Sequence, residues 1–254
     1  MKAYKTSQTS GFFDVELRVQ WLLAKGNPLS RLDAVIDWES FRPLLEAALD
    51  KPAHVGQGQA EEFNSDILLD PTRSLLVPYI GKNAAIFKCP AEKRSGKSTA
   101  PSTKGQRVPA ARTFSMSQAV GTDPYAPSRG QLAVNGPWLD GNHNHTRSGP
   151  WNTYGKLSDM ISPAPSDLWV LLDEDYRSLN DAGFAVTMVS SLFLDAPGTY
   201  HNMACGFAFG DGHSEIHKWK DGRTQITGNS FLATSFNPIN QDVTWIQERT
   251  SAQK

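Results

Sequence analysis

Hydrophobic residues recur at helical spacing only near the start of the chain. The apolar positions of residues 15–23 fall mostly on one helical face, and Gly26 and Pro28 interrupt the pattern where a helix would end. A second apolar stripe, over residues 44–49, follows Asp37, which suits an N-cap. We therefore expect a short helical segment.

After the first 53 residues the helical periodicity largely gives way to short apolar runs broken by Pro, Gly, Ser and Asn. One further helix or an extended connector is expected over residues 67–79, and short strands over 85–88 and 168–172. The pattern predicts two parts: a helical N-terminal fragment, 1–53, and a larger α+β domain, 54–254.

Two long stretches between the expected strands have the composition of loops. Residues 92–112 are rich in Lys, Ser, Thr and Pro, and residues 119–150 form another irregular region. We expect the first to be a mobile surface loop. The domain should therefore contain long loops between its strands.

The clearest strand pair surrounds the turn Gly210-Asp211-Gly212. Residues 206–209 and 213–219 flank this turn, whose glycines would supply positive φ angles. On the returning strand, alternation places two sets of side chains on opposite faces. One set is His213, Glu215, His217 and Trp219, and the other is Ser214, Ile216 and Lys218.

Charge and hydropathy exclude several classes of protein. The chain has 25 basic and 26 acidic residues, whereas a non-specific nucleic-acid binder carries a basic excess or a basic face. No window holds the roughly 18 apolar residues that span a bilayer, and the N-terminus lacks the order of a signal peptide. The sequence as written predicts a cytoplasmic chain without membrane insertion.

The two cysteines, Cys89 and Cys205, are too few for a disulfide framework and lack the CxxC spacing of a zinc site. They are either two small, partly buried residues or one disulfide pair. The sequence leaves both readings open.

Four sequence blocks resemble the H-x9-DG family of prepilin-like proteins, or pseudopilins. The signature block places His201 nine intervening residues before Asp211-Gly212, and an earlier block joins Asp173-Glu174 to Asn180-Asp181. The other two blocks are Phe-x-Cys-Pro at 87–90 and Arg-x-Phe-Ser-Met at 112–116. In the last block a phenylalanine replaces the usual tyrosine. The resemblance covers residues 64–219.

This resemblance implies a pilin-like head whose antiparallel sheet packs against a long N-terminal helix. It implies a non-enzymatic structural subunit of a type II secretion or type IV pilus-like fibre. The partners would then be other pilin-like subunits or components of a secretion apparatus in the cell envelope. No small-molecule substrate and no cofactor are expected.

The N-terminal fragment has a different resemblance. The segment that begins Gly26-Asn27-Pro28 is similar to the start of an insertion-sequence transposase of the DDE class, whose catalytic carboxylates lie in a later domain not recognisable here. It stands where a prepilin has its leader and apolar helix. We therefore expect a truncated or chimeric pseudopilin, with a transposase-derived DNA-binding remnant as the alternative.

Histidines and carboxylates also suggest metal chemistry, and a metal-dependent hydrolase is a further alternative. The pair His143 and His145 could chelate only with help, and the pair His213 and His217 would lie about 13 Å apart on a strand. No G-x-S-x-G elbow marks a nucleophile.

Calcium is the better candidate ion, because it accepts carboxylates and carbonyls from loops. The proposed ligands are Asp173, Asp175 and Asp181. Some pseudopilins hold calcium in a C-terminal loop, which adds to the hypothesis. The alternative is that these carboxylates cap turns at strand ends.

Two further expectations concern single side chains. His201 is hypothesised to fix the hairpin turn by hydrogen bonding near Asp211. The tryptophans of the loop-rich domain could line a carbohydrate-binding surface, although core anchoring is the commoner role of such residues. These tryptophans are Trp138, Trp151, Trp169 and Trp219.

Overall fold

The computed structural model describes residues 61–71, 77–78, 80–81, 83–123 and 132–254. All of them belong to one compact unit, Leu44–Lys254. The helical fragment expected over residues 1–53, with its transposase-like segment, lies outside the described residues. The proposed division of the chain at residue 53 stays a prediction.

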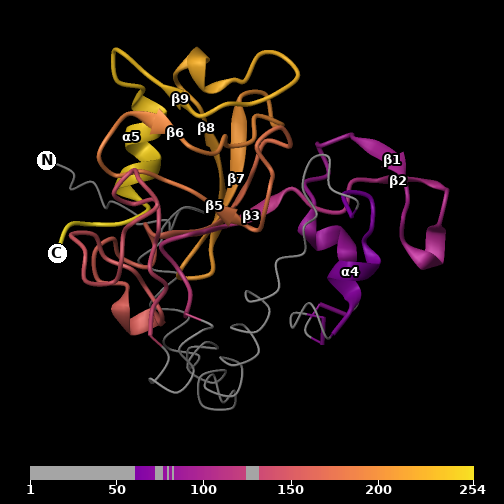
Figure 1. The fold of residues 1–254 in the computed structure, drawn as a ribbon, viewed down its shortest axis with the longest axis horizontal. Helices are drawn as coiled ribbons and strands as arrows, with labels where there is room; N and C mark the ends of the chain where they lie inside the picture. The colour runs from indigo at the N-terminus through magenta and orange to yellow at the C-terminus, as the bar shows by residue number, and fades with distance from the viewer. Residues whose placement is uncertain (1–60, 72–76, 79, 82, 124–131) are drawn as a thin grey trace, which may run out of the picture. The chain divides into compact units, whose positions relative to one another are not determined.

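A five-stranded sheet forms the centre of this unit, with the strand order β5-β3-β4-β7-β8 (Figure 1). Neighbouring strands pair antiparallel except β3 and β5, which are parallel. The strands are β3 (Phe114–Ser117), β4 (Trp169–Asp173), β5 (Gly183–Phe184), β7 (Ala204–Phe209) and β8 (Ser214–Lys218).

Two smaller antiparallel pairs and a few helices complete the described fold. The pairs are β1 (Ser95–Lys97) with β2 (Arg107–Pro109), and β6 (Leu192–Phe193) with β9 (Thr234–Ser235). The α-helices are α4 (Asp66–Leu69) and α5 (Gln241–Glu248). Four 3₁₀ turns lie at Ala84–Phe87, Pro101–Thr103, Leu157–Asp159 and Gly222–Thr224. The fold is therefore mixed α+β, mostly sheet.

The main core lies on one face of the sheet. Along β7 the side chains of Cys205, Phe207 and Phe209 alternate onto this face, as period-two geometry requires. Val243 and Ile246 of α5 pack into the same cluster, because a spacing of three residues places both on one side of the helix. The Asn240 side chain caps α5 by accepting hydrogen bonds from its first backbone amides.

The opposite face of the sheet is more open. The residues of β7 on this face include the small Gly206 and Ala208, which pair with Ile216 and with Leu171 and Ser214. Leu171 on β4 is 39% exposed and Ile216 on β8 is 64% exposed. Two large apolar side chains therefore lie at the surface beside small ones.

Several expectations from the sequence are confirmed. Strand β4 lies where residues 168–172 predicted a strand, and β7 and β8 form the predicted hairpin. Gly212 has the expected positive φ of 89°. Gly210 does not have the positive φ expected of it, and a Cβ there would lie 2.7 Å from the sulfur of the Met160 side chain. Trp169 and Trp219 are buried in the main core, as core anchors would be.

Two local expectations are wrong. Residues 85–88 do not form a strand, because the Asn83 side chain accepts a hydrogen bond from the Ala85 amide and starts a 3₁₀ turn. Residues 92–112 are not simply a surface loop. They contain the β1–β2 hairpin, and Ala100 and Arg112 within this stretch are buried. The polar composition of this stretch did not indicate the hairpin, because strands pair through backbone hydrogen bonds that polar residues can also form.

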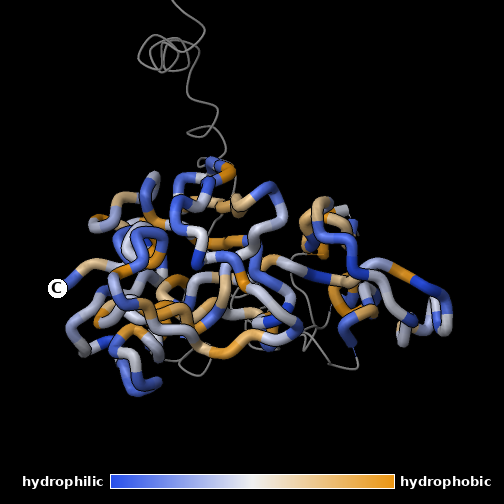
Figure 2. Tube along the Cα trace, turned by 90° about the horizontal axis from the view of Figure 1, so that it is seen from above, coloured by the Kyte–Doolittle hydropathy of each residue, from blue (hydrophilic) through white to orange (hydrophobic). Residues whose placement is uncertain are grey.

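Within the part of the chain that the structure describes, no helix is long and apolar enough to cross a membrane. Figure 2 shows short hydrophobic stretches separated by hydrophilic loops along the described chain.

Candidate functional site

The four blocks that carry the family resemblance meet at the end of β4. The backbone amide of Cys89, from the first block, donates a hydrogen bond of 2.8 Å to Oγ1 of Thr113, from the second. The Thr113 hydroxyl donates in turn to Oδ1 of Asp173, at 3.0 Å. All three residues are buried. One threonine hydroxyl therefore connects three blocks of the sequence.

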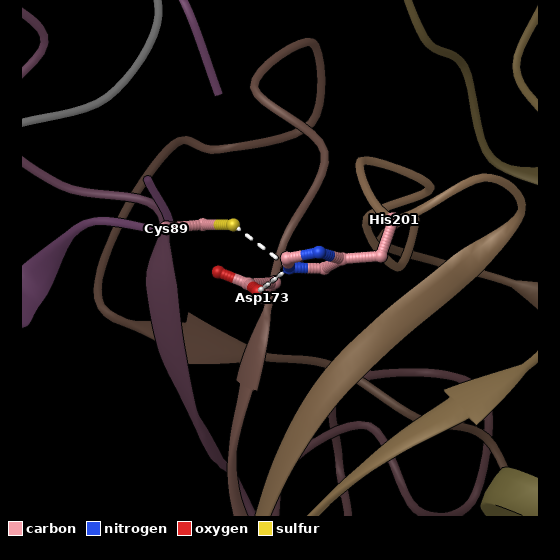
Figure 3. Close-up of side chains that lie close together, drawn as sticks. All are labelled: Cys89, Asp173 and His201. Atoms are coloured by element: carbon pink, nitrogen blue, oxygen red, sulfur yellow. Dashed lines mark hydrogen bonds and ion pairs between the residues drawn. The ribbon is translucent and has the colours of Figure 1, made fainter. Parts of the chain in front are cut away.

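The fourth block contributes His201, which completes a cluster with Cys89 and Asp173 (Figure 3). Nε2 of His201 lies 3.1 Å from Sγ of Cys89 and 4.0 Å from Oδ2 of Asp173. The three side chains point toward one another in Figure 3, and their ligand atoms all lie within 4.8 Å. We call these three residues the Cys89 cluster.

A strained turn presents His201 to the cluster. Asn202 and Met203, which follow it, have φ angles of 57° and 60°, a region that non-glycine residues seldom adopt. Just before it, the Gly198 amide donates a hydrogen bond of 2.7 Å to the carbonyl of Asp173. Trp219 Nε1 donates to the Gly198 carbonyl at 2.9 Å. The loop that holds His201 is thus tied to Asp173 on β4 and to Trp219, the residue that follows β8.

Burial dominates the electrostatics of the cluster. It raises the pKa of the Cys89 thiol, and the Asp173 carboxylate raises it further. Burial also raises the pKa of Asp173, against hydrogen bonds from Thr113 and Cys89 and the charge of His201. Without an added positive charge, the site therefore favours a neutral thiol.

This geometry differs from that of a nucleophilic triad. In a triad, the nucleophile and the carboxylate bond to the two different nitrogens of the imidazole. Here Nε2 of His201 faces both Cys89 and Asp173. A reactive cysteine also has a lowered pKa, whereas burial raises that of Cys89. The cluster is therefore poorly arranged for catalysis by a thiolate nucleophile.

Glu174, which directly follows β4, has a separate network of hydrogen bonds. Its carboxylate accepts hydrogen bonds from the hydroxyls of Ser115 and Ser178. Burial raises the pKa of Glu174 well above its usual range, and the nearby Asp195 raises it further, whereas Arg112 lowers it. The Glu174 carboxylate therefore forms its hydrogen bonds with neighbouring side chains of the domain.

The three predicted calcium ligands do not meet. Asp173 belongs to the Cys89 cluster, whereas Asp175 pairs with Arg177 at 2.6 Å. Oδ1 of Asp181 accepts a hydrogen bond of 2.7 Å from the Gly183 amide. The carboxylates of Asp175 and Asp181 are therefore paired within local turns, as the alternative interpretation expected. Asp173 lies beside a thiol and an imidazole, which are not ligands that calcium prefers.

Asn180 and Asp181, which end the same sequence block, also form hydrogen bonds within the fold. Asn180 Oδ1 accepts a hydrogen bond from the Asp181 amide, and Arg112 donates to the Asp181 carbonyl.

The hypothesis that joined His201 to Asp211 is wrong. Asp211 lies in the hairpin turn, where its Oδ1 accepts a hydrogen bond of 3.0 Å from the His213 amide. His201 precedes β7, whose five residue steps put its two ends about 17 Å apart. His201 and Asp211 therefore lie at opposite ends of β7. Gly212 completes the hairpin turn that contains Asp211.

The other histidines have separate environments. Nδ1 of His145 lies 2.6 Å from the Asn135 carbonyl, and the ring of His143 makes a T-shaped contact with Trp138. His217 stacks on Trp245. In the described residues these histidines do not gather with other ligands into a group of three.

Cys89 is a site residue that the sequence pattern did not indicate. Cys89 and Cys205 do not form a disulfide; both are free, buried thiols. A signal was present, since Cys89 and His201 belong to blocks of one resemblance.

Comparison with known proteins gives no relative. No family model, curated protein or solved structure matches the chain.

Proposed function

We propose that the described domain is the head of a non-enzymatic, pilin-like structural subunit. The observation that carries the proposal is the meeting of all four sequence blocks at the end of β4. Their polar groups bond chiefly to one another, as in the path from Cys89 through Thr113 to Asp173. Residues that bond in this way maintain a fold, which is the role a structural subunit requires of them.

The open face of the sheet supplies the second part of the proposal. In the family that the chain resembles, the sheet of the head packs against an apolar helix. Here Leu171 and Ile216 lie exposed on one face, beside the small residues Gly206 and Ala208. A helix laid across this face would bury apolar surface, worth about 25 cal/mol per Å². The proposed partners are therefore pilin-like subunits of a secretion or pilus-like apparatus.

Site-specific photo-crosslinking in the native host tests the proposal. A photoreactive phenylalanine replaces Ile216 in the full chain, and the control replaces Val189, an exposed apolar residue that lies between β5 and β6. We expect position 216 to crosslink to a subunit that has a prepilin-type apolar N-terminal helix, identified by mass spectrometry. Position 189 should not give this product.

Two outcomes would contradict the proposal. One is the absence of any pilin-like protein among the products at position 216. The other is the same set of products at positions 216 and 189, which would indicate non-specific contact with neighbouring proteins.

A further inference from the structure

We propose that Cys89, Asp173 and His201 bind one zinc-like divalent transition-metal ion, with the thiolate, a carboxylate oxygen and Nε2 as ligands. These three atoms lie within 4.8 Å of one another and come from three different parts of the chain. A structural subunit needs no metal, so this inference stands apart from the proposed function.

The distances fit a tetrahedral ion after small movements. Zinc bonds of about 2.3 Å to sulfur and about 2.0–2.2 Å to nitrogen and oxygen place neighbouring ligand atoms roughly 3.4–3.6 Å apart. The Cys89 Sγ and His201 Nε2 atoms are 3.1 Å apart, and Nε2 is 4.0 Å from Asp173 Oδ2. Shifts of about half an ångström would bring both separations to the required value.

The donor atoms select the kind of metal. Thiolate and imidazole suit zinc and similar borderline ions, whereas calcium and magnesium prefer oxygen ligands alone. Cys89 and Asp173 are almost fully buried, but the His201 side chain is 29% exposed. Water could therefore reach a fourth coordination position from the side of the imidazole.

The side chain of Thr113 supports two of the proposed ligands. The Thr113 hydroxyl donates to Oδ1, which leaves Oδ2 as the oxygen nearer to His201. The same Thr113 oxygen accepts a hydrogen bond from the Cys89 amide, so that one side chain positions two of the ligands. Such support is typical of metal sites.

Binding of the metal ion releases one proton from the chain. The Cys89 thiol loses its proton to solvent, and Sγ, Nε2 and a carboxylate oxygen each donate a lone pair to the ion. No electrons are transferred. Because the thiol must ionise, metal affinity should rise with pH, about tenfold per unit while the thiol is protonated in the metal-free chain.

Cobalt(II) is the probe for the test. The untagged full chain is reduced, stripped with a chelator and titrated with cobalt(II) alone. We expect one equivalent to bind and to produce thiolate-to-cobalt charge-transfer absorption in the near ultraviolet, which zinc(II) then abolishes by displacement. Absence of this absorption would overturn the proposal.

Cysteine variants localise the ion. Cys89→Ser should abolish the charge-transfer absorption, whereas Cys205→Ser should keep it, because the buried Cys205 thiol lies 3.1 Å from the Asp173 carbonyl but outside the cluster. Absorption that survives Cys89→Ser, or that disappears with Cys205→Ser in a folded chain, would overturn the assignment. Circular dichroism checks the folding of each variant.

His201→Gln decides the question if Cys89→Ser does not fold. This side chain is partly exposed, so its replacement should leave the core intact. We expect cobalt(II) affinity to fall at least tenfold. An affinity equal to that of the unsubstituted chain would overturn the proposal.

Discussion

Nε2 of His201 lies 3.1 Å from Sγ of Cys89, although 112 positions separate the two residues in the chain. A contact between such distant segments exists only when the sheet between them has formed. It joins the first and last of the four sequence blocks, and Asp173 on β4 lies between them. A substitution that weakens this junction should therefore lower the stability of the folded domain.

Thr113→Val should destabilise the domain by about 1–3 kcal/mol. The valine keeps the shape of the side chain but removes the hydroxyl, which leaves the Cys89 amide and Oδ1 of Asp173 without this buried partner. Chemical denaturation of the full chain measures the change.

The matched control for that variant is Thr234→Val. The hydroxyl of Thr234 donates to a backbone carbonyl at an exposed position, so its loss should change stability by less than about 0.5 kcal/mol. Equal effects of the two substitutions would show that the Thr113 hydroxyl does not hold the junction.

Gly206→Ala should also destabilise the domain, by about 1 kcal/mol or more. A Cβ at this position would lie 3.1 Å from Oδ2 of Asp173, closer than most such contacts. Asp173 cannot easily move away, because it is buried and its other oxygen is bound by Thr113. Thermal unfolding followed by circular dichroism measures the shift.

Gly222→Ala is the control for crowding. No atom outside the neighbouring residues lies within 4 Å of a Cβ at this position. The melting temperature of this variant should therefore stay close to that of the unsubstituted chain. A larger loss for Gly222→Ala than for Gly206→Ala would contradict the explanation by steric contact with Asp173.

Asp195→Asn should stabilise the protein at neutral pH. Burial raises the pKa of Asp195 from 3.8 to about 7 in the folded chain, against a hydrogen bond from the Ala185 amide. Its contribution to stability is therefore fully present below pH 3.8 and is lost as the pH rises through about 7. Asparagine carries no charge, so the variant should lack this loss.

The size of the effect follows from the shift of the pKa. Each unit corresponds to about 1.4 kcal/mol, and Glu174 shares part of the effect, so we expect a gain of about 1–3 kcal/mol at pH 8. At pH 4 the two proteins should differ little. Denaturation curves recorded at both values test this, and parallel pH profiles would contradict it.

Asp211→Asn provides a comparison of opposite sign. Although its small burial opposes the effect, hydrogen bonds from the His213 amide and ring lower the pKa of Asp211. Its contribution is therefore present above the unfolded pKa of 3.8 and is lost as the pH falls through the lower folded value. The variant should thus lose a little stability at neutral pH.

Local sequence signals predicted local structure well. The Gly210-Asp211-Gly212 turn and the alternation on each side of it were enough to predict the β7–β8 hairpin, since neighbouring residues determine a tight turn. The α5 helix was missed, although Asn240 as an N-cap and the spacing of Val243 and Ile246 were readable signals. The eight-residue helix was too short to stand out among loops.

The sequence by itself determined an α+β class, the position of β4 and the last hairpin, because these depend on spacing and on turn residues. Only the tertiary structure decided that His201 meets Cys89 and Asp173, and not Asp211. The physical reason is the length and pairing of the strands. The length of β7 separates His201, which precedes this strand, from the hairpin turn that follows it. Because β7 pairs with β4, His201 lies near the end of β4.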